Sequence, residues 1–197
     1  FEGAFLRLTI INGKKKELDS STCSIFSSKY MKWYMAERPH LFNLLSYQLI
    51  PDTTDYVSIA KIENRLAYSI WTKMTKQSPL LKISSPKTNR SCLYYYNAIL
   101  HWMKAFDFLP RSYNERDGVI HGSHYKELYL LNSSYVYKVI SALNSNLFYL
   151  WFVMLSNCRD LSMREILSFP FQVPSDERLS KKLEQLAHDL MSDYKSK

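Results

Sequence analysis

The 197-residue chain is short of glycine and cysteine, and both shortages exclude classes of protein. Its four glycines are scattered, so they cannot form the glycine-rich loop that cradles phosphate or a dinucleotide. Its three cysteines, Cys23, Cys92 and Cys158, are odd in number and contain no C-x-x-C pair. This usage predicts neither a disulfide framework nor a zinc ribbon, and it fits a reducing, cytoplasmic setting.

Long hydrophobic runs are missing as well. The longest unbroken apolar and aromatic run, 147–155, has roughly half of the ~20 residues that a membrane-crossing helix requires. It stops at the polar cluster 157–160, so it predicts a buried core helix followed by a turn, and no membrane partner is expected. No signal peptide or lipidation motif is recognisable, and because the chain starts at Phe1 on a strand-like stretch, we expect a piece of a longer protein.

Catalytic motifs are equally scarce. No G-x-S-x-G nucleophile elbow occurs, and the acid-x-Lys spacing typical of many magnesium nucleases appears only at Asp193-x-Lys195. His121 and His124 form an H-x-x-H pair that lacks a neighbouring cysteine or an obvious third ligand, so we expect polar loop histidines there. The sequence therefore gives no catalytic residue, no metal ligand and no cofactor-binding residue.

The chain is rich in cationic side chains and in tyrosine. Its 26 Lys and Arg against 18 Asp and Glu give a net charge of +8, and it has 15 tyrosines. Such a charge favours an anionic partner, with nucleic acid first and an acidic membrane surface second. A basic protein without any such partner remains the alternative.

Hydrophobic periodicity predicts an α+β fold, with a small mixed sheet, several packed helices and a long C-terminal amphipathic helix. The strands are expected at 4–12, 79–84, 91–97, 101–106, 128–132 and 168–174. The helices are expected within 29–49 on both sides of Pro39, and at 61–77, 134–144, 146–156 and 176–194. For the last helix we expect Ser175 as the N-cap and one apolar face formed by Leu179, Leu183, Leu186, Leu190, Met191 and Tyr194.

Two segments without an apolar period, 85–90 and 109–127, carry the candidate functional residues. They combine basic groups with neighbouring tyrosines, a mixture suited to DNA, because Lys and Arg bind phosphates while loop Arg, Asn and His reach base edges. The candidate DNA contacts are Lys87, Asn89, Arg90, Arg111, Asn114, Arg116, His121, His124 and Lys126, with the two asparagines as possible base readers. A solvated basic loop without a ligand is the alternative for the same residues.

Three stretches together resemble a known family. They are "FEGAFLRLTII" at 1–11, "YYYNAILHWMKAFDFLP" with the following "GSHYKELYL", and "LNSNLFYLWFVMLSNCRDLSMREILSFPFQVP" at 143–174. The first resembles a strand near the end of the catalytic domain in adenine-specific DNA methyltransferases of type IIG restriction-modification enzymes. The others resemble the C-terminal target recognition region of those enzymes, which is similar to TaqI-like specificity domains and to type I specificity subunits.

The resemblance implies a division of the chain and a function. Residues 1–56 would be the tail of a methyltransferase catalytic domain, and 57–197 a target recognition domain that ends in the helix 176–194. Its partners would be double-stranded DNA and its own upstream methyltransferase domain in a bacterial cytoplasm. The parent enzyme would be an adenine-specific DNA methyltransferase that uses S-adenosylmethionine, with a further endonuclease activity left open.

The chain departs from the family in one respect. The catalytic signature Asn-Pro-Pro-Tyr is absent, because none of the seven prolines is doubled. No catalytic residue is therefore carried over, and we expect this chain itself neither to bind S-adenosylmethionine nor to transfer methyl groups.

A protein-interaction module is the alternative function, in which the amphipathic helix 176–194 docks a partner and the basic charge is incidental. The sequence does not give the oligomeric state.

Overall fold

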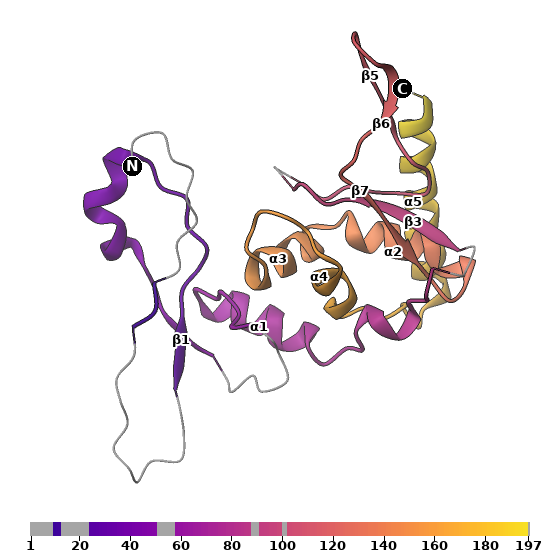
Figure 1. The fold of residues 1–197 in the computed structure, drawn as a ribbon. Coiled ribbons are helices and arrows are strands. Elements are labelled where there is room, and N and C mark those ends of the chain that lie inside the picture. The colour runs from indigo at the N-terminus through magenta and orange to yellow at the C-terminus, as the bar shows by residue number, and fades with distance from the viewer. Residues whose placement is uncertain (1–9, 13–23, 51–57, 88–90, 100–101, 197) are drawn as a thin grey trace.

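The computed structural model describes residues 10–12, 24–50, 58–87, 91–99 and 102–196, and within them it confirms an α+β fold of short strands and helices (Figure 1). The strands are β1 (Ile25–Ser27), β2 (Gln48–Ile50), β3 (Cys92–Tyr96), β4 (Ala105–Phe106), β5 (Arg111–Asn114), β6 (Gly118–His121) and β7 (Tyr125–Tyr129). The α-helices are α1 (Arg65–Met74), α2 (Val136–Leu143), α3 (Asn146–Leu155), α4 (Met163–Ser168) and α5 (Glu177–Ser196), and the 3₁₀ helices are η1 (Met35–Leu44), η2 (Leu80–Ile83) and η3 (Ser133–Tyr135).

A three-stranded antiparallel sheet, in the order β4-β3-β7, forms the centre of the fold. In β3 the side chains of Leu93 and Tyr95 are buried, whereas Tyr94 and Tyr96 are half-buried on the opposite face, as the period of two in a strand requires. This confirms the strand expected at 91–97. The strand expected at 128–132 is β7, which begins earlier, at Tyr125.

The aromatic helix α3 has five buried residues, more than any other helix or strand of the described chain. Phe148 and Trp151 have no exposed surface and Phe152 has 2%. Ser145 caps the helix, because its hydroxyl accepts a hydrogen bond from the Phe148 amide. The run 147–155 is therefore a core helix, as the sequence predicts, and Phe169 packs edge-on against both Phe148 and Trp151.

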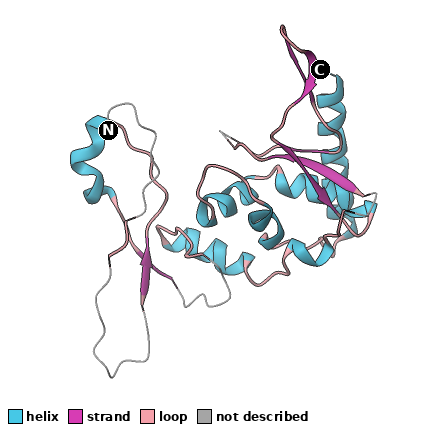
Figure 2. Ribbon diagram, in the orientation of Figure 1, coloured by secondary structure: helices cyan, strands magenta, loops and turns pink. Residues whose placement is uncertain are grey.

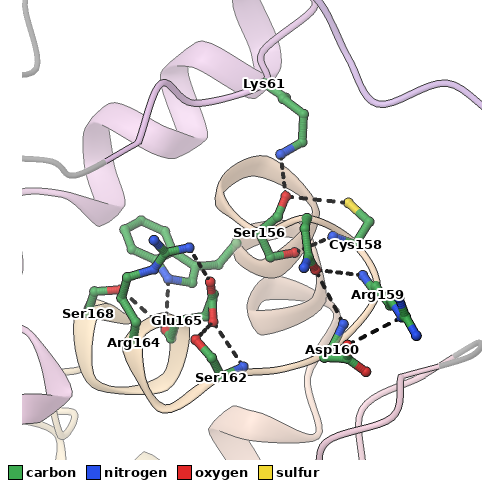
Figure 3. Close-up of polar contacts among 11 residues, drawn as sticks. Lys61, Ser156, Cys158, Arg159, Asp160, Ser162, Arg164, Glu165 and Ser168 are labelled. Carbon is green, nitrogen blue, oxygen red and sulfur yellow. Dashed lines mark hydrogen bonds and ion pairs between the residues drawn. The ribbon is translucent and has the colours of Figure 1, made fainter. Parts of the chain in front are cut away.

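The polar cluster after α3 turns the chain, also as predicted (Figure 3). The carbonyl oxygen of the Asn157 side chain accepts hydrogen bonds from the backbone amides of Arg159 and Asp160, at 2.9 and 3.3 Å. Cys158 has a φ of 57° and donates its amide to the Ser156 hydroxyl. The chain then enters α4. The segment 168–174, which was expected to form a strand, forms only a single β-bridge, between Pro79 and Pro170.

Lys61 ties the segment before α1 to the end of α3. Its ammonium donates to the Ser156 carbonyl at 2.6 Å, and its amide donates to the Met154 carbonyl at 2.9 Å (Figure 3). Burial lowers the pKa of this lysine, an effect that the nearby Cys158 and Glu165 oppose.

The long helix α5 packs along α2 (Figure 1). Contacts between the two helices include the ion pair of Lys138 with Glu184, at 3.5 Å, and the rings of Tyr137 and His188. The N-cap predicted for α5 was wrong. The carboxylate of Asp176, and not the side chain of Ser175, accepts hydrogen bonds from the backbone amides of Arg178 and Leu179.

The buried face of α5 matches the expected one only in part, because Met191 is buried and Leu190 packs against the core as predicted, but the other leucines do not. It consists of Ser180, Ala187 and Met191, whereas Leu179, Leu183 and Leu186 are 53%, 39% and 56% exposed. Two of the three buried residues, Ser180 and Ala187, are small, and the three exposed leucines lie to the side of them.

Other differences follow from short apolar runs, which periodicity cannot assign to helix or strand. The segment 29–49 forms one 3₁₀ helix, η1, with Pro39 inside it, flanked by the paired strands β1 and β2. The strand expected at 79–84 is the 3₁₀ helix η2, and of the described residues 102–106 only Ala105–Phe106 form a strand. The helix at 61–77 is confirmed as α1, and those at 134–144 and 146–156 as α2 and α3, whereas the strand expected at 4–12 lies almost wholly outside the described residues.

The boundary proposed at residues 56 and 57 also falls on undescribed residues, so the division into two domains stays a prediction. The described part of the N-terminal region contacts the rest through the Lys29–Glu63 ion pair at 2.7 Å and through the Ser46 hydroxyl, which donates to the Glu63 carbonyl. No single helix in the described ranges is long and apolar enough to cross a membrane; the segments Ser133–Leu143 and Asn146–Leu155 together reach that length but meet at 72°.

Glu165 is a buried acid, 3% exposed, and it organises the start of α4. Its carboxylate accepts hydrogen bonds from the Ser162 hydroxyl and amide and from the Arg164 guanidinium, while its carbonyl accepts from the Trp151 indole (Figure 3). Burial alone would raise the pKa of Glu165, but these hydrogen bonds outweigh it and the pKa is lowered from its ordinary value of 4.5.

We therefore predict an acid-dependent loss of stability that Glu165→Gln reduces. Because the folded-state pKa is lowered, the stabilisation is complete above pH 4.5 and is lost as the pH falls through the folded-state value. At neutral pH the substitution should cost about 1.5–3 kcal/mol, as expected for a buried hydrogen bond to a charged group. Urea denaturation at several pH values measures both effects, and Glu177→Gln, at an exposed acid, is the control. Identical pH profiles for Glu165→Gln and the unmodified chain would contradict the assignment.

Candidate functional site

The segment predicted as an irregular loop contains a β-hairpin formed by β5 and β6. Its register pairs Arg111 with His121, Tyr113 with Val119, and Asn114 with Gly118. Three residues, 115–117, close the turn, and Gly118 has a φ of 69°. This is the usual form of a three-residue hairpin loop, in which a residue in the left-handed region follows the turn and is favoured to be glycine.

Asn114 holds the turn together. Its side-chain oxygen accepts from the Asp117 amide at 2.7 Å, and its side-chain nitrogen donates to the Asp117 carboxylate at 3.2 Å. The side-chain oxygen and nitrogen of Asn114 are thus both hydrogen-bonded within the hairpin. This supports a structural role for Asn114 rather than the predicted contact with a base edge.

One face of the hairpin is open to solvent. Directly paired residues of two antiparallel strands point to the same side, so Arg111, Tyr113, Val119 and His121 share one face. The Tyr113 and Val119 side chains are 75% and 65% exposed, and Arg111 and His121 are exposed as well. We call these four residues the ribbon face, and exposed Arg116 lies at the turn beyond it.

The hairpin projects from the body of the protein (Figure 2). Its strands are not part of the central sheet, and its base lies next to the C-terminal end of α5 (Figure 1). There Lys195 forms an ion pair with Asp107 at 2.7 Å and lies over the Phe108 ring. The ribbon face is therefore presented on a narrow arm of two strands, away from the packed core.

Two further predicted residues, Lys87 and Lys126, meet at a shallow depression of about 430 Å³ beside β7. Lys87 pairs with the Glu127 carboxylate at 3.4 Å, and Lys126 donates to the Ser123 carbonyl at 3.5 Å. The hydroxyl of Tyr129 also donates to Glu127, at 2.6 Å; this bond raises the pKa of Tyr129 to about 12 and lowers that of Glu127. Both lysines are exposed, and Glu127, which lines the same depression, neutralises one of their two charges.

His124 belongs to a third group, on the sheet. Its Nδ1 lies 3.2 Å from the Asn97 side-chain oxygen, and its ring meets that of Tyr96. Lys104, which sequence reasoning missed, lies over the rings of Tyr96 and Trp102 at 5.0 and 5.6 Å. The Trp102 side chain is 63% exposed, a combination of aromatic surface and cation that suits nucleotides.

The cationic residues are therefore gathered less tightly than the sequence predicts. The hairpin brings together Arg111, Asn114, Arg116 and His121, the depression brings together Lys87 and Lys126, and His124 stands apart from both. Asn89 and Arg90 lie outside the described residues. Within the hairpin, Glu115 and Asp117 balance the two arginines, so any net attraction for an anion comes from the lysines around it.

Val119 and Tyr113 could have been recognised from the sequence. The stretch Asn-Glu-Arg-Asp-Gly at 114–118 carries a turn signal that ends in glycine, and alternating side chains on both sides of it indicate strands. The residues on both sides of this turn are only weakly hydrophobic, so hydrophobic periodicity did not predict the hairpin.

His121 and His124 do not converge on a metal site. His121 contacts the Pro110 carbonyl at 3.3 Å, whereas His124 contacts Asn97. In the described ranges no three His, Cys, Asp or Glu side chains are placed to bind a metal ion.

The comparisons with known proteins identify no relative, since no family model, no curated protein and no solved structure matches the chain.

The hairpin conformation is predicted to depend on Gly118. A side chain at its φ of 69° is strained although nothing lies within 4 Å of an added Cβ, so Gly118→Ala should cost the hairpin about 1–2 kcal/mol. Gly118→Asn is the matched control, because Asn tolerates the left-handed region. Amide hydrogen exchange of β5 and β6 would measure the difference. Equal protection in the two variants would contradict the strained-turn assignment.

Proposed function

We propose that this chain is a DNA target recognition module and that the β5–β6 hairpin is its base-reading element. The observation that carries the proposal is the ribbon face, an exposed surface with Arg111 and His121 side by side on a projecting two-stranded arm. The major groove of B-DNA is wide enough for a two-stranded ribbon, so this arm has suitable dimensions.

The chemistry of the ribbon face suits base edges. Arg111 and, at the turn, Arg116 have guanidinium groups that can bind guanine through two hydrogen bonds, and His121 can donate to or accept from a base. Tyr113 and Val119 add apolar surface of the kind that contacts the thymine methyl group. A good bidentate contact contributes about 1–3 kcal/mol of discrimination between bases.

The lysines around the sheet would supply the part of binding that is independent of sequence. Lys87, Lys104 and Lys126 lie outside the hairpin, whose own formal charges cancel. Their attraction for phosphates would hold the duplex and would weaken steeply with added salt. The chain's net charge of +8 agrees with this role.

The resemblance to type IIG enzymes extends the proposal to the parent protein. There the module would position an adenine for flipping into the pocket of an upstream methyltransferase domain in the cytoplasm. S-adenosylmethionine would bind that upstream domain, and cleavage would need a further endonuclease domain.

DNA titration tests the function. Binding of a labelled duplex library should weaken steeply between low and moderate salt, because phosphate contacts release counterions. At fixed salt, Arg111→Ala and Arg116→Ala should each lose about 1–3 kcal/mol on selected sites. Arg65→Ala, which removes the same charge from an exposed position on α1, is the matched control and should lose much less binding free energy. The proposal fails if no duplex binds, or if all three variants weaken binding equally.

A further inference from the structure

Helix α5 carries a leucine stripe that its own fold uses only at the C-terminal end, where Leu190 packs against the core. Leu179, Leu183, Leu186 and Leu190 follow one another at intervals of four, three and four residues, the spacing of the a and d positions in a coiled coil. Leu179 and Leu186 are more than half exposed, and Leu183 is 39% exposed. These residues lie about a quarter turn around the helix from the face that packs on α2.

The stripe is short, but its helix is already formed. Two heptads alone are marginal, because an isolated helix of this length must first be ordered. Here α2 and the Asp176 cap hold the 20-residue helix in place, so a partner would meet a preorganised surface. Preorganisation removes much of the entropic cost of association.

The charges beside the stripe indicate which partner fits. Lys182 and Asp189 flank the leucines on the side away from α2, and both occupy the g position of the heptad. In an antiparallel pair of identical helices g positions face each other, so Lys182 lies closest to Asp189 of the partner subunit, and the twofold axis repeats the contact. A parallel pair would instead set Lys182 beside Ala187 of the partner subunit.

The leucines fit the same arrangement. With the twofold axis between residues 184 and 185, Leu183 meets Leu186 of the partner subunit and Leu179 meets Leu190 of the partner subunit. Lys182 forms no ion pair or hydrogen bond with any residue that the structure describes, so its ammonium is available for this contact.

We propose that α5 pairs with the α5 of a second copy of this chain, antiparallel, through the leucine stripe and two Lys182–Asp189 contacts. This goes beyond DNA recognition, because it uses a different element and different residues.

Sedimentation equilibrium of the 197-residue chain tests the association. A concentration-dependent dimer is expected, and Leu186→Asp should raise its dissociation constant at least ~100-fold, because two carboxylates would enter an apolar seam. Leu66→Asp, at a 71% exposed leucine of α1, is the matched control and should leave the dimer unchanged. Circular dichroism confirms that both variants stay folded. A chain that stays monomeric, or a dimer that survives Leu186→Asp, overturns the proposal.

A charge exchange tests the orientation. Lys182→Asp and Asp189→Lys should each weaken the dimer about 10-fold, since each sets like charges together twice. The double variant restores the opposite charges and should recover the original dissociation constant. Single variants without effect, or a double variant weaker than both, would overturn the antiparallel pairing.

Discussion

Burial of the aromatic helix α3 is the constraint on which the rest of the fold depends. Phe148 and Trp151 lose all contact with water, and each contacts Phe169 beyond α4. The Trp151 indole also donates to the Glu165 carbonyl, so the same helix fixes α4 through a directed bond. Because full burial of one large apolar side chain contributes about 1.5–3 kcal/mol, the five buried side chains of α3 contribute strongly to the stability of the fold.

The elements proposed to act lie outside that core. The β5–β6 hairpin is held by its own ladder and by the Asn114–Asp117 turn, while α5 leaves Leu179, Leu183 and Leu186 exposed. Such an arrangement separates stability from recognition, since substitutions on the ribbon face or on the leucine stripe leave the packing around α3 intact. One surface is proposed for DNA, and the other for a second copy of the chain.

The sequence predicts the strongly periodic elements and fails where local signals compete. The run 147–155 could be assigned from its length and unbroken apolar character, and β3 from the alternation of its buried side chains. The hairpin at 111–121 was missed despite the turn signal at 114–118, because the residues on both sides of the turn are only weakly hydrophobic. For α5 the predicted face was right for Met191 and Leu190, but Ser180 and Ala187 are buried where Leu179, Leu183 and Leu186 were expected. Four candidate site residues lie together in a hairpin that hydrophobic periodicity did not predict: Arg111, Asn114, Arg116 and His121.

The central claim is that the exposed face of this hairpin meets the DNA duplex. The most direct test is a nuclear magnetic resonance titration of the isotope-labelled chain with a selected duplex. We predict that the largest amide shifts fall within 111–121 and that the amides of α3 stay unchanged. Shifts confined to α5 or to the N-terminal region, with the hairpin unaffected, would contradict the account.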